Sequence, residues 1–163
     1  MKKNYLLVIF TFILFSCHKD ESNQDLYDYS FFDKSELTIN SQEGSYMKYG
    51  VIDTGENLVF EYRFDKYFEN AKAMADAGYF ETVRFEIDSD LDKFSYSDEE
   101  LINIKAVLTK YCYCGFTPSD LKNGNPKGTI SGEKISNNKW NININITFYG
   151  DEEKVINGSF TMH

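Results

Sequence analysis

The sequence predicts an α+β fold made mostly of antiparallel strands, arranged as a sandwich or a small barrel with two short helices. Several segments alternate apolar and polar side chains with a period of two, which is typical of half-buried strands. The carboxy-terminal third contains three such segments in succession, separated by turn residues. Two further segments have helical character. We therefore expect about seven strands in one domain that covers residues 34–163.

Composition and charge narrow the function classes. The 163 residues are 42% hydrophobic and 17% aromatic, as expected of a globular domain. The 26 acids exceed the 17 bases and give a net charge of −9, so nucleic acid is not an expected partner. The two histidines, His18 and His163, lie close to the ends of the chain, which argues against a histidine-centred catalytic triad or metal site.

A secretory signal is predicted at the amino terminus. Two lysines precede an apolar run over residues 5–15, which is shorter than the ~20 residues needed to cross a bilayer. The run ends in Leu14-Phe15-Ser16-Cys17, which resembles the lipobox of bacterial lipoproteins. The resemblance implies that residues 1–16 are removed and that Cys17 is acylated, with residues 17–33 as the anchor and tether. The alternative is an ordinary secretory peptide with an incidental cysteine.

An export signal is predicted directly after Cys17. Lys19-Asp20-Glu21 resembles the lysine-plus-two-acids signal that sends Bacteroidetes-type lipoproteins to the outer face of the outer membrane. The resemblance implies a lipid-anchored, surface-exposed protein whose partners are the membrane and an extracellular protein or glycan. The alternative is an anchor that faces the periplasm, with a tether that is merely soluble.

The first four strands are predicted before residue 90. They cover Glu36–Asn40, Ser45–Ile52, Leu58–Asp65 and Glu81–Asp88. In the last two, alternation separates an apolar face from a polar one. The apolar faces consist of Leu58, Phe60, Tyr62 and Phe64 in one strand and Val83, Phe85 and Ile87 in the other.

Both arginines of the chain fall on the polar faces of these two strands. Arg63 lies in the first strand and Arg84 in the second. A cross-strand ion pair between Arg84 and Glu61, worth about 0.2–1 kcal/mol, is the simpler interpretation. The alternative is that the two arginines together bind an anion.

Two short helices are predicted around the second of these strands. Residues 67–78 are rich in alanine and end in Gly78, which suits the position after a helix. The other helix begins at Ser97, where Ser97 and Glu100 form a capping-box pattern. Its packing face consists of Leu101, Ile104, Leu108 and Tyr111, which recur at helical spacing.

The carboxy-terminal third predicts a three-stranded antiparallel meander. The strands are Lys127–Ile135, Lys139–Phe148 and Lys154–Met162, joined by turns. In the last strand, Gly158 indicates a bulge or close packing. The middle strand has a continuous apolar face made of Trp140, Ile142, Ile144, Ile146 and Phe148, opposite a face of asparagines and a threonine.

One acidic segment resembles a calcium loop. Asp88, Asp90, Asp92 and Glu99 occupy the first, third, fifth and twelfth positions of an EF-hand frame, where oxygen ligands bind Ca²⁺. Lys93 stands where that frame has glycine. The alternative is a solvated acidic loop, and no other cofactor is expected.

Two cysteines remain once Cys17 is acylated. Cys112 and Cys114 are free or packed thiols, a strained disulfide that forms a redox pair, or part of a soft-metal site. A bridge between them closes a very small ring, and the folded part of the chain offers no histidine to a metal. The three alternatives stay open at this point.

No segment carries a catalytic signature. The sequence contains no Gly-x-Ser-x-Gly motif and no glycine-rich phosphate loop, so we expect no catalytic residues. The leading hypothesis is a noncatalytic binding module. The alternatives are an inhibitor or immunity-type lipoprotein that captures a basic enzyme or toxin, and a hydrolase that uses two carboxylates.

Overall fold

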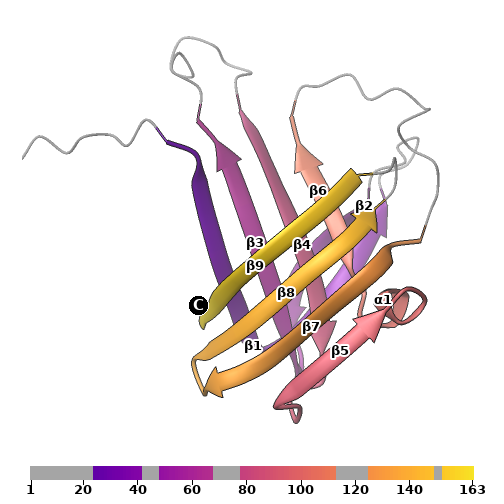
Figure 1. The fold of residues 1–163 in the computed structure, drawn as a ribbon. Coiled ribbons are helices and arrows are strands. Elements are labelled where there is room, and N and C mark those ends of the chain that lie inside the picture. Colours follow the sequence, from indigo (N-terminus) through magenta and orange to yellow (C-terminus); the bar gives the residue numbers. More distant parts are fainter. Residues whose placement is uncertain (1–23, 42–47, 68–77, 113–124, 149–151) are drawn as a thin grey trace, which may run out of the picture.

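In the described part of the chain, nine strands form one hydrogen-bonded sheet that folds back on itself (Figure 1). The computed structural model describes residues 24–41, 48–67, 78–112, 125–148 and 152–163. The strands run in the order β5-β7-β8-β9-β1-β3-β4-β6, and β2 pairs with β1. Their bounds are Leu26–Ser41 (β1), Lys48–Thr54 (β2), Asn57–Lys66 (β3), Tyr79–Ile87 (β4), Lys93–Ser97 (β5), Val107–Tyr111 (β6), Lys127–Ser136 (β7), Lys139–Phe148 (β8) and Glu152–Met162 (β9), with the helix α1 at Glu100–Asn103.

The sheet forms two main layers that are joined where β1 meets β9. The first layer contains β1, β3, β4 and β6, and the second contains β5, β7, β8 and β9, which cross the first layer obliquely in Figure 1. β1 and β9 pair in parallel over Ser30–Thr161 and Phe31–Met162, whereas the other neighbouring strands are antiparallel. β5 and β6 stand at the two ends of the strand order, so among the described strands the sheet is not a closed barrel. The predicted fold class is confirmed in its sandwich-like form.

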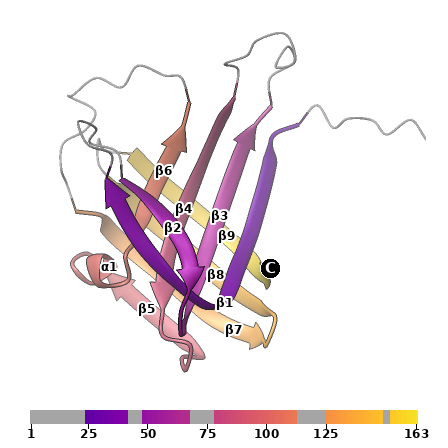
Figure 2. The same ribbon diagram turned by 180° about the vertical axis from the view of Figure 1, so that it is seen from behind.

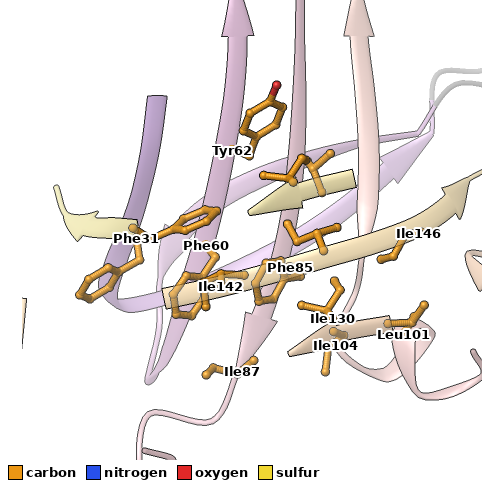
Figure 3. Packing of buried hydrophobic residues seen from close by; sticks show 14 of the residues in the cluster. Phe31, Phe60, Tyr62, Phe85, Ile87, Leu101, Ile104, Ile130, Ile142 and Ile146 are labelled. Atoms are coloured by element: carbon orange, nitrogen blue, oxygen red, sulfur yellow. The ribbon is translucent and has the colours of Figure 1, made fainter. Parts of the chain in front are cut away.

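The hydrophobic core lies between the two layers. The ring of Phe60 in β3 stacks on Phe85 of β4, with centroids 5.0 Å apart, and meets Trp140 of β8 edge-on at 5.5 Å. Figure 3 shows Phe31, Phe60 and Phe85 side by side within this cluster. The predicted apolar face of β8 is confirmed, because Trp140, Ile142, Ile144, Ile146 and Phe148 are all buried.

A third, smaller layer covers the outer face of the first. β1 bends near Lys34, whose φ is 50°, and beyond the bend it pairs with β2 over Ser35–Ser41. This hairpin lies across the back of the first layer in Figure 2 and packs Leu37 against Val59 and Val107. The sequence pattern predicts only that the outer faces of β3 and β4 are polar. In the structure, the hairpin largely covers them.

The predicted helix that begins at Ser97 is wrong over most of its length. The carboxylate of Glu100 does accept a hydrogen bond from the Ser97 N–H, at 2.9 Å, as a capping box requires. However, the helix is a single turn that ends before Lys105, whose φ is 56°. Residues 107–111 form β6 instead, because pairing with β4 over Val107–Tyr111 satisfies their backbone groups and buries Leu108.

The remaining differences concern the start of the domain and a strand that was not predicted; the other predicted helix is considered last. The boundary between tether and domain, predicted at residue 33, falls inside β1, which starts at Leu26 and pairs with β3. β5, at Lys93–Ser97, was absent from the predicted elements and forms an edge of the sheet beside β7. The helix predicted over residues 67–78 falls almost entirely outside the described residues.

Glycine is required at two places in the second layer. Gly158 confirms the predicted close packing, because a Cβ atom there would lie 2.4 Å from a ring carbon of Tyr29. Gly128 has a φ of 119°, and a Cβ atom there would lie 2.2 Å from the carbonyl oxygen of Asn145. At Gly128, both the backbone conformation and the available space exclude a side chain.

Replacing Gly128 by alanine is therefore expected to destabilise the domain by about 1–3 kcal/mol, through strain at the start of β7. Urea unfolding of the two proteins would measure the difference. Gly78→Ala is a matched control, because nothing lies within 4 Å of a Cβ atom at Gly78. Equal midpoints for Gly128→Ala and Gly78→Ala would contradict the strain argument.

Candidate functional site

The first layer extends beyond the second at the end where β1 begins (Figure 1). Register brings together the first residues of β1, the last of β3, the first of β4 and the last of β6. Leu26 lies opposite Asp65, and Phe80 lies opposite Tyr111. We call this region the open end.

Five aromatic rings line the inner face of the first layer toward the open end. Neighbouring rings are in contact. The ring centroids of Tyr29 and Tyr62 lie 5.4 Å apart, and those of Tyr27 and Phe64 lie 5.1 Å apart. Phe64 also meets Tyr79 edge-on at 6.2 Å. Tyr62 is buried and its hydroxyl points away from the apolar cluster in Figure 3, whereas Tyr27 is 57% exposed. The rings thus lead from the core to the solvent.

A chain of partly buried ion pairs joins the two layers beside these rings. The Lys154 ammonium of β9 lies 2.7 Å from the Glu81 carboxylate of β4 and 3.4 Å from that of Glu152. Lys110 of β6 lies 2.6 Å from the other oxygen of Glu152. The Tyr79 hydroxyl donates a hydrogen bond of 2.8 Å to Glu81. Two lysines and two glutamates alternate in this row of ion pairs, so their charges sum to zero.

Two tyrosines at this site, Tyr62 and Tyr79, have raised pKa values. Burial raises the pKa of Tyr62 well above its usual range, and the nearby carboxylate of Glu81 raises it further. Burial, together with the hydrogen bond to Glu81, raises the pKa of Tyr79 in the same way. Both hydroxyls therefore keep their protons at physiological pH, and that of Tyr79 donates to Glu81.

Two glutamates, the partly buried Glu152 and the buried Glu86, have depressed pKa values. Burial alone would raise the pKa of Glu152, but its bonds with Lys110 and Lys154 outweigh this and lower it. Under the β1–β2 hairpin, burial likewise opposes the lowering of the Glu86 pKa, which the Leu37 N–H and Lys105 produce at 2.6 and 2.9 Å. Both carboxylates are thus more stable as anions in the folded chain than in the unfolded chain.

Acid is therefore expected to destabilise the domain. A depressed pKa contributes stability that is fully present above the unfolded-state pKa and is lost as the pH falls through the folded-state pKa. The urea midpoint should fall progressively below about pH 5. Glu86→Gln should lower the midpoint at neutral pH and make its decline in acid shallower. A decline in acid as steep as that of the parent chain would contradict the role assigned to Glu86.

The outer face of the second layer is uncharged over much of its area. Strand register aligns Ser95, Ser131, Asn143 and Asn157 in one row across four strands. The neighbouring row consists of Ser97, Thr129, Asn145 and Val155. We call Thr129, Ser131, Asn141, Asn143, Asn145 and Asn157 the amide face.

The amide face is a regular array of hydrogen-bonding groups. Its asparagines and Thr129 are exposed, and adjacent strands place them ~4.8 Å apart. Ser159 donates a hydrogen bond of 2.7 Å to the side-chain oxygen of Asn141, which fixes that amide. A flat, neutral array of this kind suits a ligand rich in hydroxyl groups, since each amide can both donate and accept.

Of the predicted lipidation, export and cysteine residues, only Cys112 lies within the described part of the chain. Cys17, Lys19, Asp20 and Glu21 lie outside the described residues, and so does Cys114. Cys112, directly after β6, is disulfide-bonded and is therefore not a free thiol. Pairing of Cys112 with Cys114 stays a prediction.

The four residues of the predicted calcium site are not brought together. Asp88 and Asp90 lie in the turn between β4 and β5, where the Asp88 carboxylate accepts the Asp90 N–H at 3.0 Å. Asp92 lies 3.3 Å from the Lys134 ammonium, and Glu99 stands beyond the other end of β5, about 17 Å of strand away. Among the described residues, no group of three or more histidine, cysteine, aspartate or glutamate side chains could hold a metal ion.

The two arginines are each bound to carboxylates of the chain. The predicted pair of Arg84 and Glu61 is confirmed, in direct register across β4 and β3, and Arg84 also donates to the Gly50 carbonyl. Arg63 makes two hydrogen bonds to Asp65, of 2.7 and 2.9 Å. These partners occupy the groups that an anion-binding pair would use.

The sequence analysis did not predict the ion pairs at the open end, although the alternation of inward and outward side chains in β4 and β9 contains a signal for them. Glu81 lies on the same inward face of β4 as Val83 and Phe85, and Lys154 lies on the same inward face of β9 as Ile156. A charged residue at an inward position of a strand indicates a partner on the facing layer. Which strand faces it depends on the crossing of the two layers, which the pattern does not contain.

No protein-family profile, curated protein or solved structure matches the chain. No helix within the described ranges is long and apolar enough to span a membrane.

Proposed function

We propose that this chain is a lipoprotein anchored to the outer membrane through Cys17, and that its sandwich binds a neutral extracellular glycan noncatalytically. The amide face is the observation that carries the proposal. The lipobox and Lys19-Asp20-Glu21 supply the anchor and the surface location.

The charge distribution supports a neutral ligand. The chain has a net charge of −9, yet two rows across four strands of the second layer contain no charged residue. Glycan hydroxyls can exchange hydrogen bonds with Asn143, Asn145 and Asn157 without the desolvation cost of an ion. The neutrality of the face favours a ligand held by hydrogen bonds over one held mainly by charge.

The state of the buried carboxylates supports a noncatalytic role. A glycosidase needs two carboxyl groups on either side of the scissile bond. Glu81 and Glu152, which approach the same lysine at the open end, are both bound by Lys154. The lysine occupies the space between them that a substrate would need.

Affinity electrophoresis through gels that contain soluble neutral glucans, mannans or galactans would test the ligand class. At least one polysaccharide should retard the mature chain, and Asn143→Lys should abolish the retardation by placing a charge at the centre of the amide face. Asn103→Lys is the matched control, because Asn103 is an exposed asparagine in α1. Retardation that survives Asn143→Lys would reject this site.

Salt dependence separates this function from capture of a basic enzyme or toxin. Retardation by a neutral glycan should be unchanged between low and high salt, whereas capture through acidic side chains slows steeply as salt screens the charges. Binding only to a basic protein, with that salt dependence, would favour the inhibitor hypothesis.

Protease treatment of intact cells would test the location. The parent chain should be cleaved from outside, while replacement of Lys19, Asp20 and Glu21 by alanine should protect it. Cys17→Ser should release the chain from the membrane. A lipidated parent chain that resists protease would place the domain in the periplasm.

A further inference from the structure

We propose that the open end of the sandwich rests on the membrane surface, which leaves the amide face free on the flank of the domain. This inference depends on the anchor at Cys17 that belongs to the proposed function. It assigns a second membrane contact to the folded domain itself.

The length of chain before β1 limits how the domain can be placed. Nine residue steps separate Cys17 from Leu26, which span about 30 Å when fully extended. β3 alone, with ten residues, is about 33 Å long. The fully extended segment is therefore about as long as one strand, and it would have to run back along the whole domain for the opposite end to meet the membrane.

The exit of this segment from the domain is fixed at the open end. The Asp25 carboxylate accepts a hydrogen bond of 2.9 Å from the N–H of Tyr67, directly after β3. The last residue before β1 is thus tied to the neighbouring strand. The segment that leads toward Cys17 therefore leaves the described domain at the open end.

Exposed apolar side chains gather where the membrane would lie. Leu26 is 58% exposed, and Tyr27, Tyr67 and Tyr111 are exposed at the same end, on β1, after β3 and on β6. Tyrosine is enriched at membrane interfaces because its ring is apolar and its hydroxyl stays hydrated. We call these four residues the open-end rim.

Several charged side chains near the rim are paired with one another. Arg63 is paired with Asp65, and its guanidinium carbon lies 4.3 Å from the centre of the Phe80 ring. Further inside the open end, the partly buried lysines Lys110 and Lys154 are paired with Glu152 and Glu81.

Tryptophan fluorescence in phosphatidylcholine vesicles would test the contact. The lipidated mature chain is reconstituted with lipids brominated near the headgroup, which quench only nearby indoles. Tyr27→Trp and Tyr111→Trp introduce reporters into the rim. The native Trp140 has no exposed surface, so it provides a constant background and reports that each variant is folded.

Ile135→Trp is the matched control, since Ile135 is 55% exposed beside the β7–β8 turn, at the opposite end in Figure 1. The rim reporters should lose about half of their added fluorescence, as expected of indoles at the interface, while the Ile135→Trp signal is unchanged. Unquenched rim reporters in protein that floats with the vesicles would overturn the proposal and leave the anchor intact. Protein that does not float would overturn the anchor, and the membrane contact with it. Glycan retardation of the same preparation remains a separate measurement.

Discussion

Replacing Trp140 by alanine is expected to lower the free energy of unfolding by about 3–5 kcal/mol. Trp140 is fully buried, and its ring contacts Phe60 edge-on at 5.5 Å and Phe94 at 5.8 Å. It belongs to β8, while Phe60 belongs to the first layer, so the cavity would open between the two main layers. Urea unfolding followed by circular dichroism would measure the loss.

Two further variants make this prediction specific. Trp140→Phe keeps an aromatic ring in the core and should cost clearly less than the alanine variant, and it remains measurable if Trp140→Ala does not fold. Ile135→Ala removes an exposed aliphatic side chain and should change stability by less than about 0.5 kcal/mol. Similar losses for Trp140→Ala and Ile135→Ala would contradict the assigned core.

Replacing Lys154 by methionine is expected to cost about 3–5 kcal/mol, because it leaves the buried carboxylate of Glu81 without its cation. The side chain of Glu81 is 6% exposed, and Lys154 lies 2.7 Å from it. A second replacement, Glu81→Gln, should recover most of the loss, since the uncompensated charge is then gone. Thermal and urea unfolding of the single and double variants would give this coupling.

Lys93→Met is the matched control for the charge effect. Lys93 and Glu133 lie 3.9 Å apart, and both side chains are mostly exposed. Solvent screens such a pair, so its loss should cost less than about 1 kcal/mol. If the double variant Lys154→Met with Glu81→Gln is no more stable than Lys154→Met alone, the buried charge is not the cause.

The sequence predicts the strands that alternate strictly. β7, β8 and β9 are predicted almost to the residue, because apolar and polar side chains alternate along them and turn residues flank them; in β8 one face is wholly buried. The pair of Arg84 and Glu61 follows from the same reasoning, since both lie on the polar faces of neighbouring strands. These are local patterns, and they need no knowledge of the rest of the chain.

Features that depend on distant packing were missed. Leu101, Ile104 and Leu108 recur at helical spacing, but pairing with β4 makes the last of them part of a strand. Glu86 lies on a polar face and is nevertheless buried, because the bend in β1 brings a hairpin over it. The asparagines of β8 alternate visibly in the sequence. Which residues of β5, β7 and β9 lie beside them can be known only from the register of the paired strands.

β1 also determines how the domain responds to mechanical load. With the anchor proposed at Cys17, a pull from the membrane would enter at Leu26 and act along the axis of β1, which is paired with β3 over Leu26–Phe32. Force in this direction would load the ladder hydrogen bonds together, as a shear, instead of opening them one after another. The strand that starts the fold is thus also the strand best placed to resist its extraction.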